Sequence, residues 1–148
     1  MIAGSRNKLY RNGRTETCES GVGGGSEFEI AAGMKHNCAV QLGRVQCWGD
    51  NSIGQLGDGT QGNDRLTPVY VLGLTDAVMV DGGLDFTCAV RASGSVACWG
   101  RNSAGQLGNG TFGSSTTPVG VSGITDAVSV SAGFRHACAT RVNGTVMC

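Results

Sequence analysis

The sequence predicts an all-β protein built from repeated, antiparallel, four-stranded sheets, and three observations support this fold class. The chain has 26 glycines and only two prolines, which suits many tight turns between short strands. Apolar residues alternate with a period of two, and no segment shows a convincing helical period. A unit of about 50 residues recurs, and each unit has room for about four short strands, as in a blade-like sheet.

The repeat is clearest where a long segment is copied. CWGDNSIGQLGDGT, from Cys47 to Thr60, returns 51 positions later as CWGRNSAGQLGNGT, from Cys98 to Thr111. Thr67-Pro68-Val69 returns 50 positions later at Thr117. We therefore place repeats at about 27–76, 77–126 and, in part, 127–148.

Four kinds of strand are expected in these repeats. Residues 77–81 alternate with a period of two and open a repeat, as Phe28 does in the first copy. Residues 86–91 and 96–99 form a hairpin, and the apolar run 69–72 supplies another strand between a proline and a glycine.

Residues 1–26 do not match the repeats clearly. They hold four basic side chains before residue 15 and a glycine-rich run at 21–26. They form either a basic tail and linker or the degenerate end of an earlier repeat, in which Asn12-Gly13 would echo Asn109-Gly110. They contain no apolar core of a signal peptide, and Cys18 has no counterpart in the repeats.

Composition excludes several kinds of partner. Eleven basic and eleven acidic residues cancel, so the chain offers no general attraction to nucleic acid or to an anionic membrane. No apolar run approaches the roughly 20 residues of a membrane helix. We expect no nucleic-acid partner, no membrane insertion and no cofactor.

The cysteines oppose one another across each predicted hairpin. With a three-residue loop at 92–94, Val90 faces Val96 and Cys88 faces Cys98. The third copy pairs Cys138 with Cys148 in the same way. In the first copy the loop shrinks to two residues, yet Cys38 still faces Cys47.

Such pairs can form disulfides. Opposed antiparallel residues have Cα atoms roughly 4.5–5.5 Å apart, and disulfides accept about 4.4–6.8 Å. The alternative is buried thiols in a reducing compartment. Two cysteines per hairpin do not complete a zinc site, so we expect no metal.

These motifs resemble the regulator of chromosome condensation repeat family. The resemblance covers about 27–148 and is carried by A-x-G-x-x-H, C-A-V, C-W-G-x-N and the doubled G-Q-L-G-[DN]-G-T. It implies a closed β-propeller of seven four-stranded blades, and the cysteine-paired form is similar to extracellular and bacterial members. The two and a half copies here amount to an incomplete propeller, so we expect a fragment or truncated product, or a subunit that closes by self-association.

Residues shared between copies are assigned structural roles, and this includes the recurrent His36 and His136. The Asp-rich turns fit Asx turns better than a calcium loop. Asn109 and Asn143 head glycosylation sequons. The structural repeat residues are Gly33, Trp48, Gly49, Gly54, Gln55, Leu56, Gly57, Gly83, Trp99, Gly100, Gly105, Gln106, Leu107, Gly108 and Gly133.

Function is expected where the copies differ, in surface loops on a rigid sheet. The candidate partner-binding residues are Gln61, Asn63, Asp64, Arg65, Phe112 and Ser114. No catalytic set stands out, so we predict a non-enzymatic scaffold that binds a protein and lies outside the cell or on its surface. The alternatives are guanine-nucleotide exchange on a small GTPase, which the family's nuclear member implies, and inhibition of an enzyme by a secreted propeller.

Overall fold

The computed structural model describes residues 8–11, 14–17 and 28–148. Within this part of the chain, thirteen strands form four antiparallel sheets and no helix is present, so no described helix could cross a membrane. The all-β prediction is confirmed.

Three of the sheets are the repeats, and we call them blades 1, 2 and 3. Blade 1 contains β3 (Phe28–Ala32), β4 (His36–Gln41), β5 (Arg44–Gly49) and β6 (Arg65–Tyr70) in chain order. Blade 2 contains β7 (Ala77–Gly82), β8 (Phe86–Arg91), β9 (Val96–Gly100) and β10 (Ser115–Gly120). Blade 3 contains β11 (Ala127–Ala132), β12 (Ala137–Arg141) and β13 (Val146–Met147).

The fourth sheet is a hairpin within the segment that sequence analysis left unassigned. Its strands are β1 (Lys8–Arg11) and β2 (Arg14–Thr17), with Arg11 opposite Arg14. The Asn12-Gly13 pair, the glycine-rich run and Cys18 lie outside the described residues.

Two strand expectations need correction. The strand expected at 69–72 is β6, which begins at Arg65 and ends at Tyr70. In β7 the register shifts between Ala77 and Met79, and this bulge breaks the expected period of two. Ala77 and Val80 are therefore buried, whereas Val78 between them is exposed.

The hairpins between the second and third strands have the predicted register. Cys38 lies opposite Cys47 and Cys88 opposite Cys98. The two-residue turn of blade 1 places both Leu42 (φ 49°) and Gly43 (φ 79°) in the left-handed region, as a type I′ turn requires. The longer loop of blade 2 needs that conformation only at Gly94 (φ 82°).

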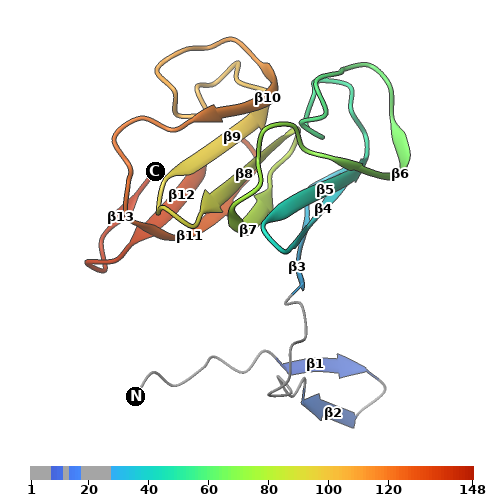
Figure 1. Cartoon of the computed structure of the whole chain (residues 1–148), viewed down its shortest axis with the longest axis vertical. Coiled ribbons are helices and arrows are strands. Elements are labelled where there is room, and N and C mark those ends of the chain that lie inside the picture. The colour runs from blue at the N-terminus through green and yellow to red at the C-terminus, as the bar shows by residue number, and fades with distance from the viewer. Residues whose placement is uncertain (1–7, 12–13, 18–27) are drawn as a thin grey trace.

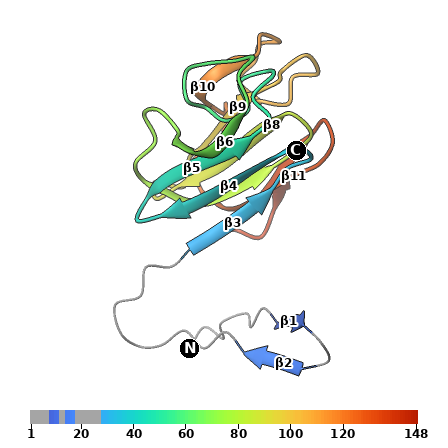
Figure 2. The same cartoon turned by 90° about the vertical axis from the view of Figure 1, so that its right-hand side faces the viewer.

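The blades stack face to face in chain order (Figure 1 and Figure 2), with β7 against β3 and β4, and β11 against β7 and β8. One apolar cluster fills each boundary. The cluster between blades 1 and 2 includes Cys38, Val40, Val45, Cys47, Leu56, Val80, Ala89 and Trp99. The cluster between blades 2 and 3 includes Phe86, Cys88, Val90, Cys98, Leu107, Ile124, Val130 and Ala139. The protein core is thus the set of boundaries between blades.

Candidate interaction surface

Two long loops stand at the same end of blades 1 and 2. Residues 50–64 join β5 to β6, and residues 101–114 join β9 to β10 (Figure 1). The backbone N–H of Gly59, in the first loop, donates to the carbonyl of Thr116 in β10 at 3.0 Å. The first loop is therefore joined, across the blade boundary, to the strand that follows the second loop.

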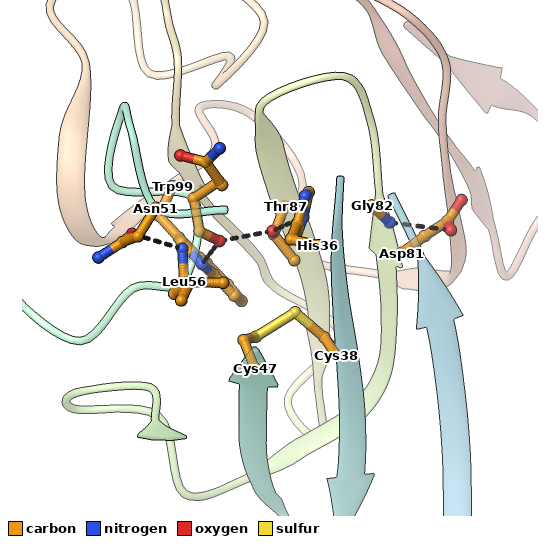
Figure 3. The surroundings of a disulfide bond; sticks show 10 residues. His36, Cys38, Cys47, Asn51, Leu56, Asp81, Gly82, Thr87 and Trp99 are labelled. Carbon is orange, nitrogen blue, oxygen red and sulfur yellow. Dashed lines mark hydrogen bonds between the residues drawn. A yellow bond between two sulfur atoms is a disulfide. The ribbon is translucent and has the colours of Figure 1, made fainter. Parts of the chain in front are cut away.

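A buried asparagine holds each loop in shape. The Asn51 Oδ1 accepts the N–H of Leu56 at 3.2 Å, and its Nδ2 donates to the carbonyl of Thr60 at 3.1 Å (Figure 3 shows the Leu56 bond). Asn102 repeats both bonds, with the N–H of Leu107 at 2.9 Å and the carbonyl of Thr111 at 2.9 Å. These local side-chain bonds replace a regular ladder, so the loops have a fixed shape without secondary structure.

The first loop adds a charged clamp. The Arg65 guanidinium forms an ion pair with Asp58 at 2.9 Å, and the Thr60 hydroxyl donates to the same carboxylate at 2.6 Å. Burial acts to raise the pKa of Asp58, but the hydrogen bonds from Thr60 and Arg65 outweigh it and hold that pKa below its usual value. In the second loop Asn109 takes the place of Asp58, so the clamp carries no charge there.

The six candidate partner-binding residues fall into two groups. Asp64 accepts the backbone N–H of Asn51, Arg65 is held by Asp58, and Ser114 accepts the N–H of Asn102. These three residues help to hold the loops. Gln61, Asn63 and Phe112 are exposed at the loop surface, as are Asp64 and Ser114.

Large apolar side chains are exposed on this end of the blades, both on the long loops and on the turn between β3 and β4, where Met34 is 63 % exposed. Phe112 is 74 % exposed, and Leu66, at the start of β6, is 95 % exposed. Aromatic side chains are enriched at protein interfaces, so Phe112 is the stronger candidate anchor of the two. Chemically, the surface offers apolar contact beside amide groups, and the described residues contain no cluster of three potential metal ligands.

A hydrogen-bonded chain locks blade 2 onto blade 1 beneath the loops (Figure 3). His36 Nε2 lies 2.8 Å from the Thr87 hydroxyl, which donates to the carbonyl of Gln55 at 2.8 Å. The Trp99 indole N–H donates to the same carbonyl at 2.9 Å. Burial lowers the pKa of His36, although the nearby Asp85 and Asp50 act to raise it. His36 is therefore a buried residue that forms a hydrogen bond between blades 1 and 2.

Sequence analysis missed Thr87, which differs between copies. The sequence signal for Thr87 is a paired replacement. The next copy has Phe86 at the position of His36 and Ala137 at the position of Thr87. The polar pair at one blade boundary thus becomes an apolar pair at the next.

Three disulfides cross the central hairpins. They join Cys38 to Cys47, Cys88 to Cys98 and Cys138 to Cys148, each with Cα atoms 4.1 Å apart. The first two pairs are buried in the blade boundaries. Trp99 packs in the boundary beside the first disulfide, whereas Trp48, its equivalent in blade 1, is only half-buried.

Comparisons with known proteins agree with this architecture. The family model "Regulator of chromosome condensation (RCC1) repeat" matches residues 43–90 and 93–140. The probable E3 ubiquitin-protein ligase HERC6 of Homo sapiens is 38 % identical over 84 residues, which cover 55 % of this chain and 8 % of the ligase. The ultraviolet-B receptor UVR8 of Arabidopsis thaliana is 38 % identical over 85 residues, which cover 55 % of this chain and 19 % of the receptor.

Solved structures show the same fold. The structure of Prp20p from Saccharomyces cerevisiae superposes with a TM-score of 0.69 at 22 % identity, over 80 % of this chain and 32 % of that one. The chain thus spans only a small part of its curated relatives and about a third of this structure.

The expectation that the protein is not an enzyme is wrong. Several relatives of 34–38 % identity are named as ligases, so membership in this group of sequences does not indicate a lack of enzymatic activity. The matched segment covers only 8 % of each of these ligases, so the absence of a catalytic set in the present sequence could not exclude an enzymatic activity.

Proposed function

The chain belongs to the regulator of chromosome condensation repeat family, and from this membership we propose that it is part of a β-propeller that binds a partner protein through the loops after β5 and β9. One observation carries the proposal. Phe112 and Leu66 are exposed beside two loops whose shape is fixed by buried asparagines and which are bonded across the blade boundary. A fixed shape keeps the entropy cost of binding low.

The relatives support binding of proteins as the kind of activity. Prp20p, whose structure has this fold, is described as binding Gsp1p and histones. Nothing in the present loops selects one of those partners, so the proposal is limited to a protein with an apolar contact surface.

We place the protein outside the cell or on its surface. The support is the set of paired cysteines, since repeated cross-strand disulfides persist mainly in oxidising compartments. Fractionation of the source organism, with antibody detection in medium, surface and cytosolic fractions, tests this part. Recovery in the cytosol with free thiols would contradict it.

Photo-crosslinking tests the binding surface. We would place p-benzoylphenylalanine at Phe112, and as a matched control at Leu42, which is 80 % exposed on the turn at the opposite end of β5. A crosslinked protein obtained from Phe112 but not from Leu42 supports the proposal. Equal yields at both positions, or a product from Leu42 alone, would contradict it.

Nucleotide exchange on a small GTPase is the second candidate, because a solved structure with this fold comes from a protein described as binding Gsp1p. In this chain, however, the loops at 50–64 and 101–114 are held by internal bonds, and the repeat spacing of 50–51 residues leaves no room for an inserted loop. Release of a fluorescent guanine nucleotide from a panel of small GTPases, with and without the protein, separates the two. Accelerated release favours exchange over a passive scaffold.

A further inference from the structure

The end of the blades that carries the two long loops, which we call the loop end (Figure 1), holds charged side chains in pairs of opposite sign. In blade 1, Lys35 acts on the Asp50 carboxylate and stabilises its charged form. The equivalent residues of blade 2 are Asp85 and Arg101, which form an ion pair at 3.0 Å. The sign at each position is thus reversed from one blade to the next, whereas the pairing is kept. What the two blades share at this end is electrical neutrality.

The other charges at the loop end balance as well. Arg65 forms an ion pair with Asp58 at 2.9 Å. Over this end of the three blades, four basic residues accompany four acidic residues: Lys35, Arg65, Arg101, Arg135, Asp50, Asp58, Asp64 and Asp85. Interleaved charges of both signs give no extended field of one sign, so this surface does not attract a partner by net charge.

The second loop and the strand after it contain no charge. No charged residue occurs from Asn102 to Thr125. Phe112 stands within this uncharged stretch, and a Cβ atom at Gly105 would lie 3.5 Å from its Cε1 atom, so the edge of the ring lies against its own loop. The rest of the side chain is open to solvent, since it is 74 % exposed. Gln61, the counterpart of Phe112 in the first loop, is exposed even with the next blade in place, so a following blade does not cover this position.

A surface of this kind favours an uncharged partner. A charged group that packed against residues 102–125 would lose its hydration without gaining an opposite charge, and this loss weakens binding. An apolar group at the same place would bury the Phe112 ring and gain the free energy of that burial. Met34 and Leu66 add exposed apolar area on blade 1.

We infer that the partner of the loop end is a protein with an uncharged apolar patch that packs on Phe112, and that charge does not select it. The inference rests on the proposed scaffold role and adds the chemistry of the partner's contact surface. It sets aside nucleic acids and strongly acidic or basic protein segments, whose binding depends on opposite charge.

Opposite charges placed at one position test the inference. Gly113 follows Phe112, its φ is not positive, and a Cβ atom there would meet no atom within 4 Å, so the loop tolerates a side chain. We would prepare Gly113→Glu, Gly113→Lys and the uncharged control Gly113→Ser, each with p-benzoylphenylalanine at position 112. The probe is the combined medium and surface fraction of the source organism at limiting concentration, and the readout is the yield of crosslinked product.

Both charged variants should lower the yield by at least about threefold relative to Gly113→Ser, because a charge of either sign would be buried without a partner. Raising the NaCl concentration tenfold should change the yield of the Gly113→Ser protein by less than about threefold, because binding releases few counterions. Gly120→Glu and Gly120→Lys are matched controls. Gly120 ends β10, away from the loops, and also has no atom within 4 Å of a Cβ atom, so both variants should leave the yield unchanged.

A yield that rises with one charge and falls with the other would overturn the inference and identify a charged partner. A larger effect of salt would overturn it too, as would full yields in both charged variants. The scaffold proposal would survive these results, because it requires only a product at Phe112 and none at Leu42. If no product forms at Phe112, the scaffold proposal fails, and the present inference fails with it.

Discussion

His36 in blade 1 lies 2.8 Å from the hydroxyl of Thr87 in blade 2, and the two residues are replaced together at the next boundary by Phe86 and Ala137. Both partners are buried. Because a buried polar group without a partner costs about 1–3 kcal/mol, a change at one position favours a compensating change at the other.

A double-mutant cycle tests this coupling. We expect the single changes His36→Phe and Thr87→Ala each to destabilise the protein by about 1–3 kcal/mol. The first change crowds Thr87 with a larger ring, and the second leaves His36 without its hydrogen-bond partner. The double variant reproduces the pair found at the second boundary, and its loss should be smaller than the sum of the single losses by about 1 kcal/mol. Urea unfolding measures all four proteins, and simple additivity would contradict the coupling.

The buried His36 predicts that the free energy of unfolding depends on pH. Burial lowers the pKa of His36 in the folded protein, against the opposing effect of Asp85 and Asp50. The unfolded chain, with a histidine pKa of about 6.5, then binds more protons than the folded one in the window below 6.5. The free energy of unfolding should fall as the pH drops from about 6.5 toward the folded pKa, by at most about 1.4 kcal/mol per pH unit.

Urea titrations at pH 8, 7, 6 and 5.5 check this expectation. The His36→Phe/Thr87→Ala variant is the control. Its free energy of unfolding should fall less steeply with decreasing pH, because it lacks the contribution of His36. An identical decline in this variant would assign the effect to other groups.

Gly57 and Gly108 form a matched pair for the indole contact. Both residues have positive φ, 70° and 61°, so alanine carries a similar backbone cost of about 1–2 kcal/mol at either position. Only at Gly57 does the new methyl group meet an indole, that of Trp99. We expect Gly57→Ala to destabilise the chain by about 1–3 kcal/mol more than Gly108→Ala. An equal loss of stability in the two variants, measured by thermal unfolding, would show that the Trp99 indole does not constrain residue 57.

The three hairpins should be crosslinked in the purified protein. Intact mass with alkylation should show six blocked cysteines without reductant and seven reactive cysteines with it. Replacing Cys38 and Cys47 together by alanine should cost about 2–3 kcal/mol, because each bridge closes a loop of about ten residues. Cys18→Ser serves as the control and should leave the six blocked residues unchanged.

Leu42 offers a stabilising change. It is a leucine with a φ of 49°, and its side chain is 80 % exposed, so little packing is lost when it is replaced. Asparagine tolerates this conformation and is preferred before glycine in a type I′ turn. Leu42→Asn should raise the free energy of unfolding by about 0.5–1 kcal/mol. Ala92→Asn, in the three-residue loop where φ is not positive, should give no such gain in the same denaturation assay.

The hairpin registers could be predicted because they depend on nearby residues. The turn length fixes which residues face each other, and the opposed Cys38 and Cys47 in a shortened loop checked that assignment within the sequence. The bulge at Val78 could not be predicted, since the extra residue is accommodated by packing of β7 against blade 1 rather than by local pattern.

The candidate site was predicted only in outline. Variation between copies located the loops, but it did not separate Arg65, which is held by Asp58, from the exposed Phe112. That distinction depends on contacts between residues several positions apart in an irregular loop, for which no periodicity exists. Asn51 was recognised as a repeated residue, but its role as the buried centre of the loop appears only in three dimensions.

In blades 1 and 2, a glycine at the tip of the central hairpin accepts a hydrogen bond from the first strand of the next blade. The Ala77 N–H donates to the Gly43 carbonyl, and the Ala127 N–H donates to the Gly94 carbonyl. Each sheet is thus fastened mainly to its immediate neighbours in the chain. Under tension applied to the two termini, such an array would yield by releasing whole sheets one after another. The crosslinked hairpins would stay closed during each release, which shortens the length of polypeptide freed at every step.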